Sequence, residues 1–284
     1  MIIDSHCHAW SRWPYQPPVP DSESRGIIEQ LLNEMDLRGV NKAVVICARI
    51  DHNPDNNDYI AAQAARYPDR LYQFPDVDCA WTDTYHQPGA VDRLREIADR
   101  WPIKGFTHYL RGDDDGAWLD GPEGQAFFSL AAERGLIASI AGRPEHQPAL
   151  RRVGQRYPNL TILCHHLAGL RLATPNAAEQ LREVLASAAL PNIAIKLSGF
   201  AYCSRVAWEY PYTDTHAIIE PLYQAFGPQR LYWGSDYPVV RFSMTHQQSL
   251  EAFRTHCTFI PEADRALILG DALEVLLARS GSTR

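Results

Sequence analysis

The chain has 284 residues, of which 45% are hydrophobic and 21% charged, a balance that can bury a large core and argues against a disordered chain. Its net charge of −7 argues against a broad nucleic-acid-binding surface, because such surfaces need clustered Lys and Arg side chains. No apolar run approaches the ~20 residues of a membrane span, and the first residues lack the pattern of a signal peptide, so we expect a cytoplasmic protein without membrane contact.

Short β-rich segments alternate with helical patterns along the chain, which is typical of repeated βα units. Strands are predicted at residues 2–8, 42–48, 70–77, 103–109, 136–141, 159–165, 192–198 and 230–236. Helices are predicted at 22–38, 122–134 and 176–188. An open doubly wound sheet would use the same alternation, but the number of strands and the clustering of site residues at strand ends favour a closed (β/α)8 TIM barrel. We therefore predict an α/β fold with a single domain over residues 1–284.

The first predicted strand carries the most informative fragment, Asp4-Ser5-His6-Cys7-His8. Alternate residues of a strand face the same side, so the imidazoles of His6 and His8 could share one metal ion. A lone H-x-H pair also occurs by chance. Its place at the end of an apolar strand, before a long loop, favours a functional pair.

The loop after this strand is rich in proline and aromatic residues between residues 10 and 20. In a barrel it lies at the C-terminal ends of the strands, where loops surround the active site. Trp10, Trp13 and Tyr15 are therefore expected either to form the wall or lid of a pocket or to belong to a rigid surface loop.

Two further strand ends carry residues of the same chemistry. His165 and His166 end the sixth predicted strand, and only one of two adjacent strand residues can face the barrel axis. Asp236 ends the eighth predicted strand, where a carboxylate can ligate a metal or act as a general base. The pattern predicts imidazoles and a carboxylate at the same face of one barrel.

Five fragments carry a family resemblance that spans nearly the whole chain: DSHCH at 4–8, KGFTHYL at 104–110, LCHHLAG at 163–169, IKLSG at 195–199 and WGSDYP at 233–238. Together they resemble the amidohydrolase superfamily, in particular its amidohydrolase-2 branch of lactonases, among them 2-pyrone-4,6-dicarboxylate lactonase and sugar lactonases, and metal-dependent decarboxylases. The IKLSG fragment looks more like the lactonases.

The resemblance implies that His6, His8, His166 and Asp236 are the family's metal ligands. It favours His166 over His165 because the family histidine is followed directly by a turn such as Leu-Gly. Binuclear members use a bridging ligand on strand four and a histidine on strand five, and neither is apparent here. We predict at most one divalent ion, with zinc as the first choice, and keep metal-free hydrolysis as the alternative.

Other candidate site residues lie at or just beyond predicted strand ends. His108 could be catalytic, by binding substrate or polarising its carbonyl, or could be hydrogen-bonded within the barrel wall. An arginine can hold a substrate carboxylate with two hydrogen bonds. From the arginines at positions 49, 111, 143, 171 and 241, we select Arg111 and Arg241 for substrate binding, with Tyr202 and Trp10 as further binding residues.

The reaction predicted from these residues is hydrolysis of a small carboxylated or sugar-derived lactone, with Asp236 and His166 as catalytic residues. Asp236 would take a proton from the attacking water, and the histidine cluster would polarise the carbonyl. The alternatives are a metal-dependent decarboxylase of a small aromatic or unsaturated acid and a barrel that binds a small acid without turnover. No G-x-S-x-G, Walker or G-x-G-x-x-G pattern is found, and the six cysteines form no C-x-x-C pair. The expected partner is a small-molecule substrate, and the sequence leaves a homo-oligomer open.

Overall fold

The computed structural model describes residues 1–15 and 19–281. Its strands are all parallel and form two ladders, β1-β2-β3 and β4-β5-β6-β7-β8. Their bounds are β1 Ile3–Cys7, β2 Lys42–Ile46, β3 Leu71–Phe74, β4 Gly105–Tyr109, β5 Ile137–Ala141, β6 Thr161–Cys164, β7 Ile193–Leu197 and β8 Leu231–Trp233.

Two short seams of backbone hydrogen bonds join the ladders into a closed barrel. Between β3 and β4, the Thr107 amide donates to Pro75 O at 2.8 Å, and Thr107 O accepts from Val77 N at 3.0 Å. Between β8 and β1, the Asp236 amide donates to His6 O at 2.7 Å, and His8 N donates to the Tyr237 carbonyl at 2.6 Å. The predicted (β/α)8 barrel is confirmed, and its second seam is made by candidate site residues.

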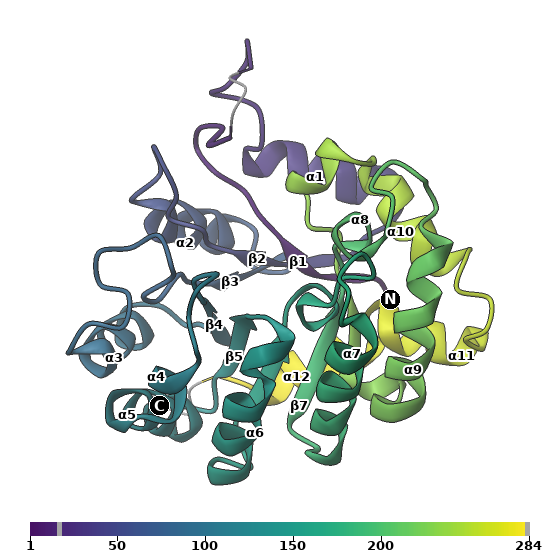
Figure 1. The fold of residues 1–284 in the computed structure, drawn as a ribbon. Helices are drawn as coiled ribbons and strands as arrows, with labels where there is room; N and C mark the ends of the chain where they lie inside the picture. Colours follow the sequence, from purple (N-terminus) through teal and green to yellow (C-terminus); the bar gives the residue numbers. More distant parts are fainter. Residues whose placement is uncertain (16–18, 282–284) are drawn as a thin grey trace.

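Most helices surround the strands on the outside of the barrel (Figure 1). Their bounds are α1 Ile28–Arg38, α2 Asn56–Arg66, α3 Ala90–Arg100, α4 Ala117–Asp120, α5 Pro122–Glu133, α6 Gln147–Arg156, α7 Ala177–Ala186, α8 Phe200–Cys203, α9 His216–Phe226, α10 His246–Arg254, α11 Glu262–Ala266 and α12 Ala272–Arg279. The helix predicted at 22–38 begins six residues late because Gly26 has a φ of 91°, a conformation that a helix cannot contain.

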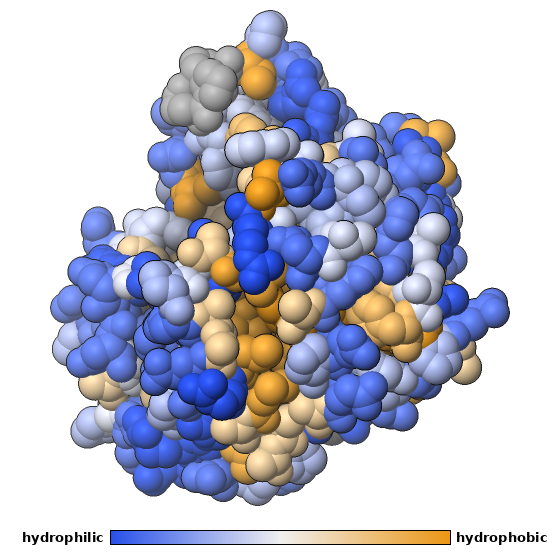
Figure 2. Space-filling view, turned by 45° about the vertical axis from the view of Figure 1, so that its right-hand side comes forward, coloured by the Kyte–Doolittle hydropathy of each residue, from blue (hydrophilic) through white to orange (hydrophobic). Residues whose placement is uncertain are grey.

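The face of the molecule drawn in Figure 2 is largely hydrophilic, as expected for helices that bury one side against a barrel. Hydrophobic residues collect on this face along a furrow between hydrophilic flanks. No helix within residues 1–15 and 19–281 is long and apolar enough to cross a membrane. All six cysteines lie in this part of the chain and are free and buried.

The barrel interior is filled by alternate strand residues, as the two-residue period requires. Buried side chains from seven strands share one hydrophobic cluster with α12: Ile3, Val44, Ile46, Phe74, Ile137, Leu163, Ala194, Tyr232, Leu273, Leu276 and Leu277. The intervening strand residues, such as Val45, Phe106 and Ile195, belong to a second cluster together with residues of the surrounding helices. Several inward positions toward the C-terminal strand ends carry buried polar side chains, and these build the candidate site.

Candidate active site

His6 and His8 enter the barrel from the end of β1. A bulge between Asp4 and Cys7 adds one residue to β1 relative to β2. The two imidazoles then lie side by side, with 3.2 Å between their Nε2 atoms. The Nδ1 atom of His8 lies 2.8 Å from the carbonyl of Ile46, which can only accept, so His8 carries its proton on Nδ1 and turns a lone pair on Nε2 toward His6.

Asp236 completes this side of the site from the end of β8. Its Oδ1 atom lies 3.3 Å from Nε2 of His8 and 3.5 Å from Nε2 of His6. Its Oδ2 atom accepts a 2.5 Å hydrogen bond from the Tyr202 hydroxyl. Asp236 has a φ of 59°, and its backbone amide takes part in the seam with β1, so the backbone fixes where the carboxylate points.

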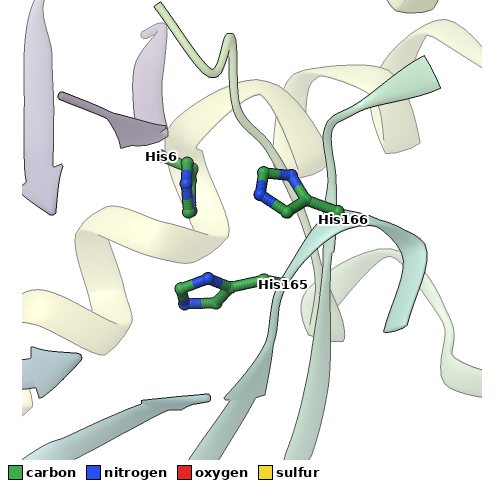
Figure 3. A group of neighbouring side chains, drawn as sticks. All are labelled: His6, His165 and His166. Atoms are coloured by element: carbon green, nitrogen blue, oxygen red, sulfur yellow. The ribbon is translucent and has the colours of Figure 1, made fainter. Parts of the chain in front are cut away.

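His165 and His166 both reach the site, in contrast to the prediction that only one of them could. β6 ends at Cys164, and His165 follows Leu163 on the inward face of the strand. His166 has left the strand and has a φ of 45°, which turns its side chain back toward the barrel. Each ring centroid lies 4.5 Å from that of His6, and Figure 3 shows the three imidazoles around a common space.

Two further residues contact this cluster and were not identified from the sequence. Lys196 of β7 is fully buried in the barrel, with its Nζ atom 3.1 Å from Nδ1 of His6. Tyr109, at the end of β4, places its hydroxyl 3.5 Å from Nε2 of His6. The sequence does carry a signal for the lysine, because it occupies an inward position in the otherwise apolar run Ile193–Leu197.

Burial decides the charge of most groups in the site. It lowers the pKa of Lys196 to about 7, against the opposing effect of Asp4, and lowers the pKa of His166 to about 4. Burial and the charge of Lys196 also hold the pKa values of His6 and His165 well below the usual range, so these three imidazoles are neutral at pH 7. Burial raises the pKa of Asp236, but His166, His8 and Tyr202 outweigh it, and the net shift is downward.

His108 does not lie in the site, so its predicted catalytic role is wrong. It alternates with Tyr109 and therefore faces outward from β4, where its ring contacts Trp118 and Phe127. Its Nδ1 atom lies 2.9 Å from Val77 O, and its Nε2 atom lies 3.2 Å from that of His86. The structure agrees with the alternative prediction for His108, a histidine that is hydrogen-bonded within the barrel wall.

We expect His108→Gln to weaken folding without changing catalysis. The variant leaves the Val77 carbonyl without its donor in a buried place, which costs about 1–3 kcal/mol of the free energy of unfolding. Urea denaturation measures this loss, and kcat on the best substrate is expected to stay within about twofold of the wild type. A large fall in kcat in the folded variant would return His108 to the catalytic residues.

A cavity of about 430 Å³ opens beside the histidines. Its wall includes His165, His166 and Tyr202, and it also carries the arginines at positions 143 and 171. Glu145, Thr174 and Gln180 supply further polar groups. A space of this size suits a small molecule with one or two polar or charged groups.

The two arginines selected from the sequence lie elsewhere. Arg111 is exposed, donates from Nε to Ala80 O at 3.0 Å and stacks its guanidinium on Tyr85 at 4.5 Å. Arg241 is exposed on the 3-10 turn Val239–Phe242 and does not line the cavity. Arginines beyond strand ends do line the cavity, but they are Arg143 and Arg171, in the loops after β5 and β6.

The aromatic residues after β1 are divided between two places. Trp10 is fully buried, stacks on His8 with 5.2 Å between ring centroids and donates from Nε1 to Ala48 O at 2.8 Å. It therefore lies behind His8 and not on the wall of the cavity. Trp13 and Tyr15, in the segment that follows β1, pack against Phe242 of the turn after β8. Residues 16–18 of this segment lie outside the described residues.

A family model described as amidohydrolase (Amidohydro_2) matches residues 3–276. The chain belongs to the amidohydrolase family. It is 29% identical to the L-fucono-1,5-lactonase of Burkholderia ambifaria, over 85% of this chain and 81% of that protein.

Two solved structures share the fold of this amidohydrolase over 98% of its chain and 99% of theirs. One is an amidohydrolase from Burkholderia multivorans with bound zinc, at 20% identity and a TM-score of 0.80. The other, from Acinetobacter baumannii, is described as a probable 2-pyrone-4,6-dicarboxylic acid hydrolase with citric acid bound, at 18% identity and a TM-score of 0.78.

The donor atoms of the amidohydrolase site are arranged so that they could hold a metal ion. His6, His8 and Asp236 offer ligand atoms that all lie within 4.8 Å of one another, and so do His6, His165 and His166. The imidazoles of His8 and His166 have Nδ1 against Ile46 O and Ser198 Oγ, which leaves Nε2 toward the site. This arrangement is typical of metal-binding histidines, so the residues fit a divalent cation.

Proposed function

We propose that this amidohydrolase opens a small lactone that carries a carboxylate. The observation that carries the proposal is the position of Asp236: its Oδ2 is hydrogen-bonded to Tyr202, and Tyr202 and His166 line a cavity that also exposes Arg143 and Arg171. The proposed base therefore lies directly behind Tyr202, in the wall of a cavity that also carries two arginines. The similarity to a sugar lactonase over most of both chains supports the reaction class.

Asp236 is the proposed general base. It is ionised at neutral pH because its pKa lies below the usual range, and its Oδ1 atom has no donor fixed on it apart from the neighbouring imidazoles. A water molecule beside Oδ1 would give up its proton as it attacks the lactone carbonyl. The protonated Asp236 then returns that proton to the ring oxygen as the carbon–oxygen bond breaks, and a hydroxy acid leaves.

A divalent cation held by the histidines and Asp236, with zinc as the first choice, would polarise the lactone carbonyl and make the attacking water more acidic. Without a cation, the imidazoles and the hydroxyls of Tyr109 and Tyr202 are the polar groups that remain to orient the water and the carbonyl. Asp236 takes the proton in both versions, and in the version with a cation it is also a ligand. Assay before and after chelation separates the two versions.

The cationic wall of the cavity predicts the substrate's charge. Arg171 lines the cavity with His166, and its positive charge contributes to lowering the pKa of that histidine. A guanidinium there can hold a carboxylate with two hydrogen bonds while the lactone carbonyl lies toward the histidines. Arg143 lines the same cavity from the loop after β5, so a dicarboxylate also has a place for its second charge.

The test is a panel of carboxylated and neutral lactones, assayed on metal-analysed wild-type enzyme and on Arg171→Gln. We expect the variant to raise KM for carboxylated lactones by about 10- to 100-fold, because a hydrogen bond to a charged group contributes about 1.5–3 kcal/mol. KM for neutral lactones is expected to change little. Arg111→Gln is the matched control, since Arg111 lies outside the cavity.

Failure to hydrolyse any lactone, with CO2 formed from an aromatic or unsaturated acid, would overturn this proposal in favour of the decarboxylase. If the wild type hydrolyses neutral sugar lactones and Arg171→Gln behaves as the wild type, the reaction stands and the carboxylated substrate class is wrong.

A further inference from the structure

One histidine of the site has a ring nitrogen that nothing in the described structure satisfies. His165 is 1% exposed, and its Nδ1 atom has no hydrogen-bond partner among residues 1–15 and 19–281. A buried polar atom without a partner costs about 1–3 kcal/mol, so native structures contain few of them. A missing partner beside other metal-binding groups indicates a ligand.

The other nitrogen of His165 is firmly held. Its Nε2 atom lies 2.6 Å from Oγ of Ser139, an inward-facing residue of β5. If Nε2–H donates to the serine oxygen, Nδ1 carries a lone pair. The ring nitrogens of His165 are then arranged like those of His8 and His166: one lies against the barrel wall, and the other is available to a ligand.

The surroundings of His165 supply the rest of a cation site. Its ligand atom lies within 4.8 Å of those of His6 and His166, and its ring meets the ring of His6 nearly at right angles. Figure 3 shows the three imidazoles converging on one space from β1 and from the end of β6. Three imidazole nitrogens placed in this way favour Zn²⁺ or Co²⁺ over harder cations.

His246 shows why the open nitrogen alone does not carry the argument. It is also buried, and neither of its ring nitrogens has a hydrogen-bond partner in the described chain. Its nearest charged group is Asp4 at 3.7 Å, whose two oxygens already accept from Ser235, and it belongs to neither group of potential metal ligands. Of these two histidines, only His165 combines an open nitrogen with a converging set of donors.

The geometry points to His165 as an additional metal ligand, which binds a cation together with His6 and His166, next to the group His6, His8 and Asp236. This inference deepens the metal-dependent version of the proposed function. Ser139 is then a positioning residue that holds the His165 ring with Nδ1 toward the cation. Metal binding can be measured without any substrate, so failure of this inference and failure of lactone hydrolysis are distinguishable.

The first experiment is His165→Gln. The amide of glutamine can occupy the place of Nε2 and keep the contact with Ser139, but it provides no atom at the position of Nδ1. We expect the Zn²⁺ dissociation constant, measured by competition with a chromophoric chelator, to rise by at least about tenfold. The Co²⁺ absorption spectrum is expected to change in shape and intensity, because a coordinating nitrogen is lost.

Ser139→Ala is the second variant, and it leaves the imidazole in place. Its Zn²⁺ affinity is expected to fall by about tenfold, because the ring is no longer held by its outer partner. His108→Gln serves as a buried-histidine control outside the barrel interior and is expected to bind Zn²⁺ as the wild type does. Thermal unfolding without metal checks that each variant is folded.

Unchanged Zn²⁺ affinity and an unchanged Co²⁺ spectrum in folded His165→Gln would overturn the inference, even if turnover falls. That combination would make His165 a group that acts on the substrate. If His165→Gln does not fold, the result for Ser139→Ala decides: wild-type affinity in that variant contradicts the proposal.

Discussion

Asp236→Asn is expected to lower kcat for lactone hydrolysis by about 10²- to 10⁴-fold, the range that a positioned general base contributes. Asparagine retains the shape of the side chain and can still meet the Tyr202 hydroxyl, but it cannot take a proton from water. The measurement is kcat and KM on the lactone that the wild type hydrolyses best. KM is expected to change far less than kcat, because the cavity wall is untouched.

Asp236 also belongs to a group that could hold a metal, so the base and ligand roles must be separated. Bound zinc is therefore measured in the same preparation, and kcat is repeated at saturating Zn²⁺. Tyr202→Phe is the matched control: it removes one hydrogen bond to Oδ2 and leaves the carboxylate, so we expect a loss of only about tenfold. Near-normal turnover of Asp236→Asn with saturating zinc would show that Asp236 acts as a ligand and not as a base.

The sequence alone predicts the barrel and the positions of some of the site residues. The two-residue period of β1 correctly predicts that His6 and His8 share one side of the strand. Closure of eight strands into a barrel predicts that Asp236, at the end of the eighth strand, lies near them. The two-residue period of a strand does not predict that the side chains of both His165 and His166 reach the site. β6 ends between Cys164 and His165, and the positive φ of His166 then redirects its side chain, which a strand pattern does not describe.

Other errors have a similar origin. The place of His108 near the end of a strand predicts a site residue, although the two-residue period that places Tyr109 inward places His108 outward. The arginines could not be ranked from the sequence, because the loops that carry them differ in direction, and only the folded chain shows which ones reach the cavity. Lys196 is predictable from the sequence, because a lysine at an inward position of an apolar strand is rarely buried without a polar partner.

Lys196→Met is expected to make the protein more stable near neutral pH while reducing its activity. Burial lowers the pKa of Lys196 from 10.5 to about 7, so between these two values the unfolded chain binds a proton that the folded chain does not. The wild type therefore gains stability as pH rises through this window, by up to about 1.4 kcal/mol per pH unit, and carries the full penalty only below about pH 7. Methionine fills a similar volume without a charge and removes the penalty.

Urea denaturation at several pH values from 7 to 9 tests this expectation, because the advantage of Lys196→Met over the wild type should shrink by about 2 kcal/mol across that interval. Lys104→Met is the control: Lys104 precedes β4 at the opposite end of the barrel and donates to Ser280 O, so the pH dependence of this variant's stability should parallel that of the wild type.

The activity of Lys196→Met should fall about 10- to 100-fold, since Nδ1 of His6 loses the contact that orients its ring. A constant stability difference from pH 7 to 9 would mean that the buried lysine keeps its proton in the folded protein. It would then donate to Nδ1 of His6, which would leave His6 with its hydrogen on Nε2 and unable to bind a metal through that atom.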